Sequence, residues 1–331
     1  MKELETVSAN TLIATPFEPL KMLVQNLIGE GITIIGGGSK CGKSWLMLKL
    51  CLAVADGAPF FDMETEQADV LYLCLEDSFR RLQERLFKLT DNDAPENLHM
   101  AVSAGVIGNE LEDQIRDFKD KHPNLRLIVV DTLQMVREQD PYLNAYADDY
   151  KCLTRLKALA ESIGLSIVLV HHLRKLGSSD PFEMLTGSTG LQGASDTLMV
   201  LKRERGTNTG ILYVTGRDME QQKLTMRFDK GRWALQERAD AIQIQEERIP
   251  PFIHRVLKWM PPEHWQGTAT ELIEAMSETE IVPTAVTKLL NQHHVFLQEN
   301  GIEYAYHRTR DERLITLTRI ISEPEVVNMD V

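Results

Sequence analysis

The stretch ITIIGGGSKCGKSW, residues 32–45, joins a short apolar run to three glycines and a Gly-Lys-Ser. Residues 37–44 satisfy the pattern GxxxxGK[ST] in full. A loop between an apolar strand and a helix presents backbone N–H groups to an anion, and the helix dipole adds to the attraction. This stretch therefore predicts a phosphate-binding loop whose ligand is a nucleoside triphosphate, ATP.

Within this loop, Lys43 is expected to reach the β- and γ-phosphates, and the Ser44 hydroxyl is expected to bind Mg²⁺. The candidate nucleotide-binding residues are Gly37, Gly38, Ser39, Lys40, Cys41, Gly42, Lys43, Ser44 and Trp45. Lys40 either helps to neutralise phosphate or lies exposed on the loop. Cys41 fills a position that takes a small residue.

The net charge, the cysteine spacing and the lengths of the apolar runs exclude several classes of protein. A net charge of −13 over 331 residues excludes a uniformly basic nucleic-acid binder. The four cysteines form no CxxC pair, which argues against a zinc site or a disulfide scaffold and indicates a reducing cytosol. The N-terminus lacks an apolar signal region, and no apolar run is long enough to span a bilayer. A soluble, cytoplasmic protein without membrane contact is expected.

Apolar runs alternate with amphipathic segments over most of the chain. ITII, VLYLCL, LIVVD and SIVLVH are nearly all apolar, which is typical of parallel strands covered on both faces. Helices are expected between them at 43–56, 78–89, 109–121 and 148–163. This alternation predicts an α/β domain with a doubly wound, mostly parallel sheet. Four short runs after residue 195 predict antiparallel additions to the sheet.

The expected domain organisation has five parts. A lead-in and subunit-contact segment covers 1–31, an ATPase domain 32–236, a charged linker 237–250, a small domain 251–322 and an acidic tail 323–331. The small domain shows helices at 252–260, from a capping box at Thr268, and at 283–294 with Pro283 in its first turn. A hairpin follows around the turn TRDE. Three helices and a hairpin predict a winged helix.

Acidic and imidazole side chains follow three of the expected strands. Asp131 ends the run LIVVD, as a Walker B aspartate that supports Mg²⁺ would, although a strand-end Asp can also cap a turn. Glu76 is the candidate general base, and Asp77 is a helix N-terminal charge or metal support; both could instead be helix caps. His172 is a candidate contact to the γ-phosphate, with a core imidazole as the alternative for His171.

Taken together, these motifs resemble the RecA superfamily of P-loop ATPases, and in particular the branch of plasmid replicative helicase RepA. The resemblance rests on GGGSKCGKSWL, VLYLCLEDSFRRLQERL, LIVVDTL, IVLVHHLRK, GSTGLQGASDTLMVL and VTGRDME, and it covers residues 36–235. It implies a RecA-like fold and makes Glu76 the catalytic glutamate. It makes His172 the γ-phosphate sensor, where relatives often carry Gln. It also implies a homo-oligomeric ring, a hexamer, with ATP held between subunits.

Such rings complete each site with a basic finger from the neighbouring subunit. Helicase RepA has its arginine where this chain has Asp196, so the resemblance does not identify the finger. The run LKRERG resembles the Lys-x-Arg finger of related ATPases, which favours Arg205, then Arg203, then Arg217. A solvated strand-end charge is the alternative for each.

Two loops, 133–147 and 173–192, are expected to line the ring's channel and grip single-stranded DNA. Arg174 and Lys175 offer phosphate contacts, and Gly177 and Gly187 allow movement. Tyr142, Tyr146 and Phe182 could stack bases or simply pack the loops. Residues 250–331 carry 7 Lys and Arg against 12 Asp and Glu, so the winged helix is as much a candidate for docking a replication or recombination protein as for binding origin DNA.

The function expected from the sequence is an ATP-hydrolysing motor on single-stranded DNA. A RepA-like replicative helicase of a plasmid, phage or integrated element is the leading hypothesis. A KaiC- or RadA-like recombination or loading ATPase without unwinding activity is the first alternative. The second is a nucleotide-gated DNA-binding regulator that acts through its winged helix.

Overall fold

A computed structural model of the chain describes residues 6–16, 21–137, 145–173, 180–185, 189–204, 206–240, 243–244, 249–308 and 313–320. The chain divides into two compact units, Met1–Ala241 and Ile242–Val331. None of the described helices is both long enough and apolar enough to cross a membrane.

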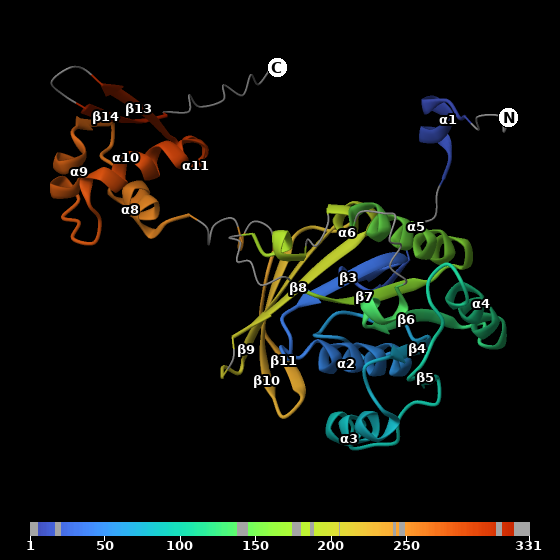
Figure 1. The fold of residues 1–331 in the computed structure, drawn as a ribbon. Helices are drawn as coiled ribbons and strands as arrows, with labels where there is room; N and C mark the ends of the chain where they lie inside the picture. The colour runs from blue at the N-terminus through green and yellow to red at the C-terminus, as the bar shows by residue number, and fades with distance from the viewer. Residues whose placement is uncertain are drawn as a thin grey trace, which may run out of the picture. The chain divides into compact units, whose positions relative to one another are not determined.

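The first unit is built on a nine-stranded sheet (Figure 1) with the order β11-β10-β9-β8-β3-β7-β6-β4-β5. Its strands are β3 (Gly31–Gly37), β4 (Asp69–Cys74), β5 (Leu98–Ala101), β6 (Leu125–Asp131), β7 (Ser166–His172), β8 (Thr197–Arg203), β9 (Thr209–Gly216), β10 (Gln222–Asp229) and β11 (Arg232–Ala239). The strands from β8 to β5 in this order are parallel, and β9, β10 and β11 extend the sheet in antiparallel pairing. The predicted mixed, mostly parallel α/β sheet is confirmed.

Helices cover both faces of this sheet (Figure 1). They are α2 (Lys43–Asp56), α3 (Phe79–Leu89), α4 (Leu111–Lys121), α5 (Ala145–Ile163) and α6 (Thr189–Ala194), with 3₁₀ turns η1 (Leu133–Val136) and η2 (Phe182–Leu185). A short helix, α1 (Ala9–Ala14), precedes them. The predicted helix positions are confirmed, because each amphipathic segment folds as a crossover between parallel strands.

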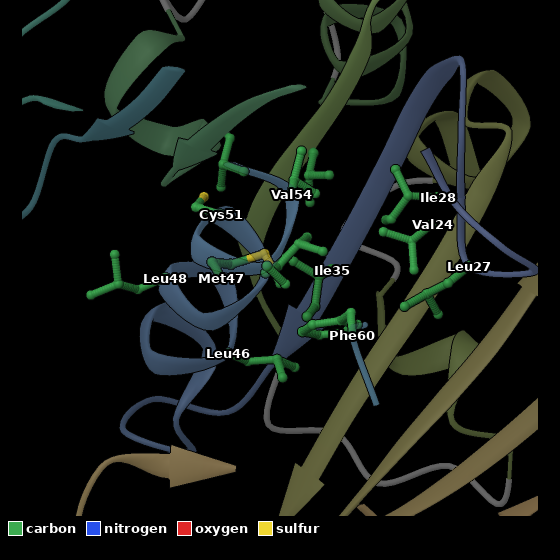
Figure 2. Close-up of a cluster of buried hydrophobic side chains, with 14 of the residues drawn as sticks. Val24, Leu27, Ile28, Ile35, Leu46, Met47, Leu48, Cys51, Val54 and Phe60 are labelled. Carbon is green, nitrogen blue, oxygen red and sulfur yellow. The ribbon is translucent and has the colours of Figure 1, made fainter. Parts of the chain in front are cut away.

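Two apolar cores lie on the two faces of the sheet. One packs α2 and Leu82 of α3 against one face, and the other packs α4, α5 and α6 against the opposite face. Figure 2 shows part of the first core, with Ile35 of β3 and Met47 of α2 among its residues. Successive side chains of a strand point to opposite faces of the sheet. Every second residue of each strand therefore lies on the face that α2 covers.

The structure adds three features that the sequence pattern did not reveal. The segment 22–29 forms a small hairpin of β1 (Met22–Val24) and β2 (Ile28–Gly29), whose Leu23, Val24, Leu27 and Ile28 are buried in the α2-side core (Figure 2). The edge strand β5 was not predicted, because LHMA is short and only half buried. The expectation that β8 is antiparallel was wrong, since it pairs in parallel with β3 and only β9 reverses direction.

The second unit holds α8 (Pro251–Trp259), β12 (His264–Gly267), α9 (Ala269–Ala275), α10 (Pro283–Gln292), α11 (His294–Glu299), β13 (Ile302–Arg308) and β14 (Arg313–Arg319). Its strands form a small antiparallel sheet in the order β12-β14-β13. The predicted capping box at Thr268 and the predicted hairpin are both confirmed. The unit has its own apolar core, with Ile253, Val256 and Leu317 fully buried.

Candidate active site

The phosphate loop lies between the end of β3 at Gly37 and the start of α2 at Lys43. Gly42 has φ +105°, a left-handed conformation, and a Cβ there would lie 2.9 Å from the Trp233 ring. A Cβ on Gly37 would lie 3.0 Å from the Leu201 carbonyl oxygen. The two glycines are therefore required by backbone conformation and by close packing. The resulting bare loop at a helix N-terminus suits an anion.

Lys43 is folded back over this loop. Its Nζ donates to the carbonyl oxygens of Gly37 at 2.8 Å and Gly38 at 3.1 Å. Burial lowers the pKa of Lys43, and the nearby charges of Asp131 and Glu76 oppose that shift. The ammonium group thus already lies against the loop where a phosphate would bind.

Asp131 ends β6 on the same side of the sheet, 7% exposed. The Tyr72 hydroxyl donates to its Oδ2 at 2.9 Å, and Ser44 also hydrogen-bonds to it. Burial raises the pKa of Asp131, an effect that these two hydrogen bonds oppose. A hydroxyl beside a buried carboxylate is an all-oxygen donor set, which fits a hard cation such as Mg²⁺.

Glu76 and His172 meet beside this pair. Glu76 follows the end of β4, and its Oε1 accepts a hydrogen bond from the Thr132 hydroxyl at 3.0 Å. The same oxygen is 3.9 Å from Nε2 of His172, and Nδ1 of His172 is 3.4 Å from Nζ of Lys43. The carboxylate and the imidazole are each about half exposed, so both can reach a bound molecule.

The alternation of side chains along β7 explains why His172, and not its neighbour His171, reaches the phosphate loop. Val168 and Val170 of β7 belong to the α2-side core, so His172 continues that face. His171 points to the opposite face, where burial lowers its pKa and Asp149 and Arg137 are its charged neighbours. His171 therefore matches the alternative of a core imidazole.

Asp77 is held by ion pairs within its own segment. Its carboxylate contacts Arg81 at 2.8 Å and Arg85 at 2.6 Å and is 10% exposed. The cap of α3 is Ser78, whose side chain accepts from the Arg81 N–H. The charge of Asp77 is thus matched by two arginines, which fits its expected helix N-terminal role better than metal support.

Two of the three candidate fingers, Arg203 and Arg217, lie near opposite ends of β8. Arg205 lies outside the described residues. Arg203 ends β8 and lines the same cleft as the phosphate loop of its own chain. Arg217 lies near the opposite end of β8, because Thr197 pairs with Gly216 while Arg203 pairs with Gly210.

Asp196, which stands where helicase RepA has its arginine, has a structural role. Its Oδ2 accepts from the Ile32 N–H at 2.9 Å, and its Oδ1 pairs with Lys157. Nη1 of Arg217 is 3.8 Å from Oδ1 of Asp196, and Nη2 of the same arginine donates to the Gly193 carbonyl. This cluster joins the starts of β3 and β8, at the far end of the strands from the phosphate loop.

The predicted DNA-binding residues are mostly outside the described part of the chain. Arg174, Lys175, Gly177, Gly187, Tyr142 and the side chain of Tyr146 fall there. Phe182 is described, and its ring is 8% exposed within the core on the α5 face. Of its two alternatives, stacking bases or packing the loop, Phe182 matches the second, because the apolar ring is buried rather than presented to a ligand.

The site residues surround one cleft of about 470 Å³. It is lined by Ser39, Lys40, Cys41, Gly42, Lys43, Ser44, Trp45, Cys74, Glu76, Asp77, Arg81, Arg85, Asp131, Thr132, His172, Arg203 and Phe228. An adjoining hollow of about 950 Å³ shares Trp45 and Phe228 with it. The ends of four strands, β3, β4, β6 and β7, thus bring a phosphate loop, two acids and an imidazole to one place.

Sequence reasoning missed four residues of this site. Tyr72 and Thr132 hydrogen-bond to the two acids, while Phe228 lines the cleft and the Trp233 indole N–H donates to the Gly42 carbonyl at 3.0 Å. Thr132 follows Asp131 directly, a signal that could have been used. The others lie on strands whose neighbours only the fold reveals.

Comparisons with known proteins give a family for more than half of the chain and a fold for its first unit. Residues 2–178, just over half of the chain, match the model of the AAA domain family. The DNA repair protein XRCC3 of Mus musculus is 28% identical over 211 residues, which are 53% of this chain and 58% of that protein. The chain therefore spans less than two thirds of the length of this curated relative.

Two solved structures share the fold. One is an ATPase domain, which superposes with a TM-score of 0.52 at 18% identity, over 63% of this chain and 85% of that one. The other is a DnaB-like replicative helicase, solved to show its interactions with primase, which gives a TM-score of 0.52 at 18% identity, over 62% of this chain and 57% of that one. The first unit thus has the RecA-like fold of these ATPase domains.

Proposed function

The chain belongs to the AAA domain family, and from this premise we propose that it hydrolyses ATP to drive movement on single-stranded DNA. The observation that carries the proposal is the meeting of Lys43, Glu76 and His172 in one cleft beside Asp131. These are the parts that phosphoryl transfer to water requires: a phosphate cradle, a metal-side acid and a group that orients water.

The residues have separate roles in this proposal. The loop amides and Lys43 bind the β- and γ-phosphates. For this, Lys43 replaces its hydrogen bonds to the carbonyl oxygens of the loop with contacts to phosphate oxygens. Ser44 and Asp131 would hold Mg²⁺, which neutralises charge on the phosphate oxygens. Their hydrogen bond to each other, and the donation from Tyr72, keep both oxygens directed at one point.

Glu76 accepts the proton of the attacking water, and Thr132 holds its carboxylate in place through the 3.0 Å hydrogen bond. His172 contacts the γ-phosphate and loses that contact after hydrolysis. Because residues 173–192 follow directly, the loss would be transmitted to a segment proposed to grip DNA.

The finer identity proposed is a RepA-like replicative helicase of a plasmid, phage or integrated element, acting as a hexameric ring. The RecA-like fold shared with the solved ATPase domain and with the DnaB-like replicative helicase supports it. The second unit is proposed to be a winged helix, which its helix–strand–helix–helix–helix–hairpin order and its sheet order β12-β14-β13 support. It would contact DNA or a replication or recombination protein.

A recombination or loading ATPase that does not unwind DNA is the second candidate. The 28% identity to a DNA repair protein favours it. A nucleotide-gated regulator that acts through the winged helix is the third. The three hypotheses predict different effects of single-stranded DNA on the ATPase rate, and different outcomes when the protein meets duplex DNA.

The test measures the ATPase rate with and without single-stranded DNA and then the unwinding of a forked duplex. Stimulation with unwinding is expected; stimulation alone favours the recombination or loading ATPase. Binding of duplex sites without any stimulation favours the regulator. No ATP turnover under any condition would refute the proposal.

Glu76→Gln tests the assignment of the general base. We expect the hydrolysis rate to fall by about 10²–10⁴-fold while MgATP still binds, because the loop and the cation ligands are unchanged. The matched control is Glu84→Gln, an exposed glutamate that pairs with Arg80 on α3 and should leave the rate unaltered. Wild-type turnover in Glu76→Gln would contradict the assignment.

A further inference from the structure

Arg203 is held against the phosphate loop of its own chain. Its guanidinium lies over the Phe228 ring at 4.2 Å and 5.7 Å from the Trp233 ring. Its Nη2 donates to the Lys40 carbonyl oxygen at 3.2 Å. Two aromatic contacts and one hydrogen bond thus direct the side chain toward the cleft of its own subunit.

The direction of this side chain follows from the pleat of β8. Met199 and Leu201 belong to the core on the α2 face, so Arg203 continues that face beyond the end of the core. Lys202 points the opposite way, with its ammonium group 5.6 Å from the Tyr213 ring. Asp131 and His172 reach the cleft by the same alternation on their own strands. Arg203 is the last residue of β8, as Asp131 is of β6 and His172 is of β7, and it lies on the same face of the sheet.

The charges around the cleft leave Arg203 available to an anion. Arg81 and Arg85 are both paired with Asp77. Among the described residues, no carboxylate forms an ion pair with Arg203. A guanidinium has five N–H donors in a planar fork, and the Lys40 carbonyl accepts from one of its nitrogens. The remaining donors match the geometry of phosphate oxygens.

We propose that Arg203 binds the phosphates of the nucleotide held by its own subunit and is not a finger that completes a neighbour's site. The inference rests on the proposed function in one respect, namely that the ligand of the cleft is a nucleoside triphosphate. It differs from what the resemblance to ring ATPases implies for this position.

Binding of MgADP to the full-length protein, measured by calorimetry, tests the proposal without hydrolysis. Arg203→Ala should weaken the affinity about 10- to 100-fold, the loss of a charge-assisted hydrogen bond. Arg203→Lys should weaken it less, because the charge remains and the fork is lost. Lys202→Ala on the opposite face is the matched control and should bind as the wild type does. Unchanged affinity in Arg203→Ala would overturn the proposal.

Inorganic pyrophosphate, used as a competitor of ADP, distinguishes a phosphate contact from a contact to the base. Pyrophosphate should lose affinity for Arg203→Ala by the same factor as ADP does. A loss confined to ADP would overturn the proposal, since Arg203 would then act on the nucleoside. Thermal unfolding without nucleotide checks that each variant is folded.

Mixing two variants that each carry a defect in the nucleotide site tests the subunit in which Arg203 acts. When Lys43→Ala and Arg203→Ala chains are mixed, no ATP turnover beyond that of the separate proteins is expected, because each chain has a defect in its own site. Recovery of turnover would overturn the proposal, as a finger supplied by the neighbour would restore some sites. Wild-type protein that binds MgADP through Arg203 but never hydrolyses ATP would refute the ATPase function and leave this inference standing.

Discussion

Asp131 illustrates how far a single residue could be interpreted from its local sequence. Its position after four apolar residues was enough to predict a metal-side carboxylate. The partner that donates to it, Tyr72, is on a different strand and looks like any other apolar residue of a buried run. Parallel pairing of β4 with β6 brings the two together, and no local pattern encodes that pairing.

Asp131→Asn should stabilise the nucleotide-free protein while removing activity. Burial raises the folded-state pKa of Asp131, so the folded protein binds a proton more tightly than the unfolded chain. Ionisation of this group therefore costs stability once the pH exceeds the ordinary pKa of about 3.9. Urea unfolding at pH 7–8 should show the variant more stable by about 1 kcal/mol.

Two further measurements constrain this prediction. The stability difference between Asp131→Asn and wild type should shrink as the pH falls and vanish only below the ordinary pKa of about 3.9, where the wild-type carboxyl is protonated in both states. MgATP hydrolysis by the variant should be lost at every pH. A variant less stable than wild type at neutral pH would contradict the interpretation.

Tyr72→Phe should weaken the apparent affinity for Mg²⁺ in ATP hydrolysis. Without the hydroxyl, the pKa of Asp131 rises further, because one of the hydrogen bonds that lower it is gone. The Mg²⁺ concentration that gives half-maximal rate should increase roughly tenfold. The increase should be larger at pH 6 than at pH 8, since protons compete with the cation for the carboxylate. An equal effect at both pH values would argue against this cause.

At the scale of elements, β8 shows what sequence patterns leave open. Its apolar run was recognised as a strand, but its direction was not, because parallel and antiparallel strands of this length look alike. The structure places it parallel to β3, and Asp196 at its start accepts from the Ile32 N–H. A residue that stood out in the sequence only as a departure from a family pattern proves to join two strands.

Asp196→Ala should destabilise the first unit by about 2–3 kcal/mol, because it removes a partly buried acceptor and leaves Lys157 with only the exposed Glu161, 4.0 Å away, as an acidic partner. Asp196→Asn should cost less, since the amide oxygen can still accept from Ile32. The control is Glu161→Ala, the other acid near Lys157, which is 63% exposed and should cost below about 0.5 kcal/mol. Denaturant unfolding measures all three, and equal costs would contradict the role of Asp196.

At the scale of the molecule, the two units have separate cores. Trp233 and Ile35 belong to the first unit, Ile253 and Leu317 to the second, and within the described ranges no residue is shared between the clusters. Each unit can therefore unfold as its own cooperative block.

Calorimetry of the full-length protein should accordingly show two unfolding transitions. MgADP at 100 times its Kd should stabilise only one of the two units, by about 2.7 kcal/mol, because the ligand binds one unit. The midpoint temperature of that transition alone should therefore rise. A protein of residues 1–241 should retain that ligand-dependent transition. A single transition that moves as a whole with MgADP would contradict the separation.

Short-range pattern alone was sufficient for the phosphate loop, the strands β3, β4, β6 and β7, the helices between them and the capping box at Thr268. The strands are short continuous apolar runs, the helices repeat every three to four residues, and the phosphate loop and the cap are local motifs, so neighbours in the chain specify them. The partner of Asp131, the burial of Phe182, the direction of β8 and the position of Arg203 all depend on contacts between distant segments. Which side chain meets which ligand is set by strand order and pleat, and these exist only once the sheet has assembled.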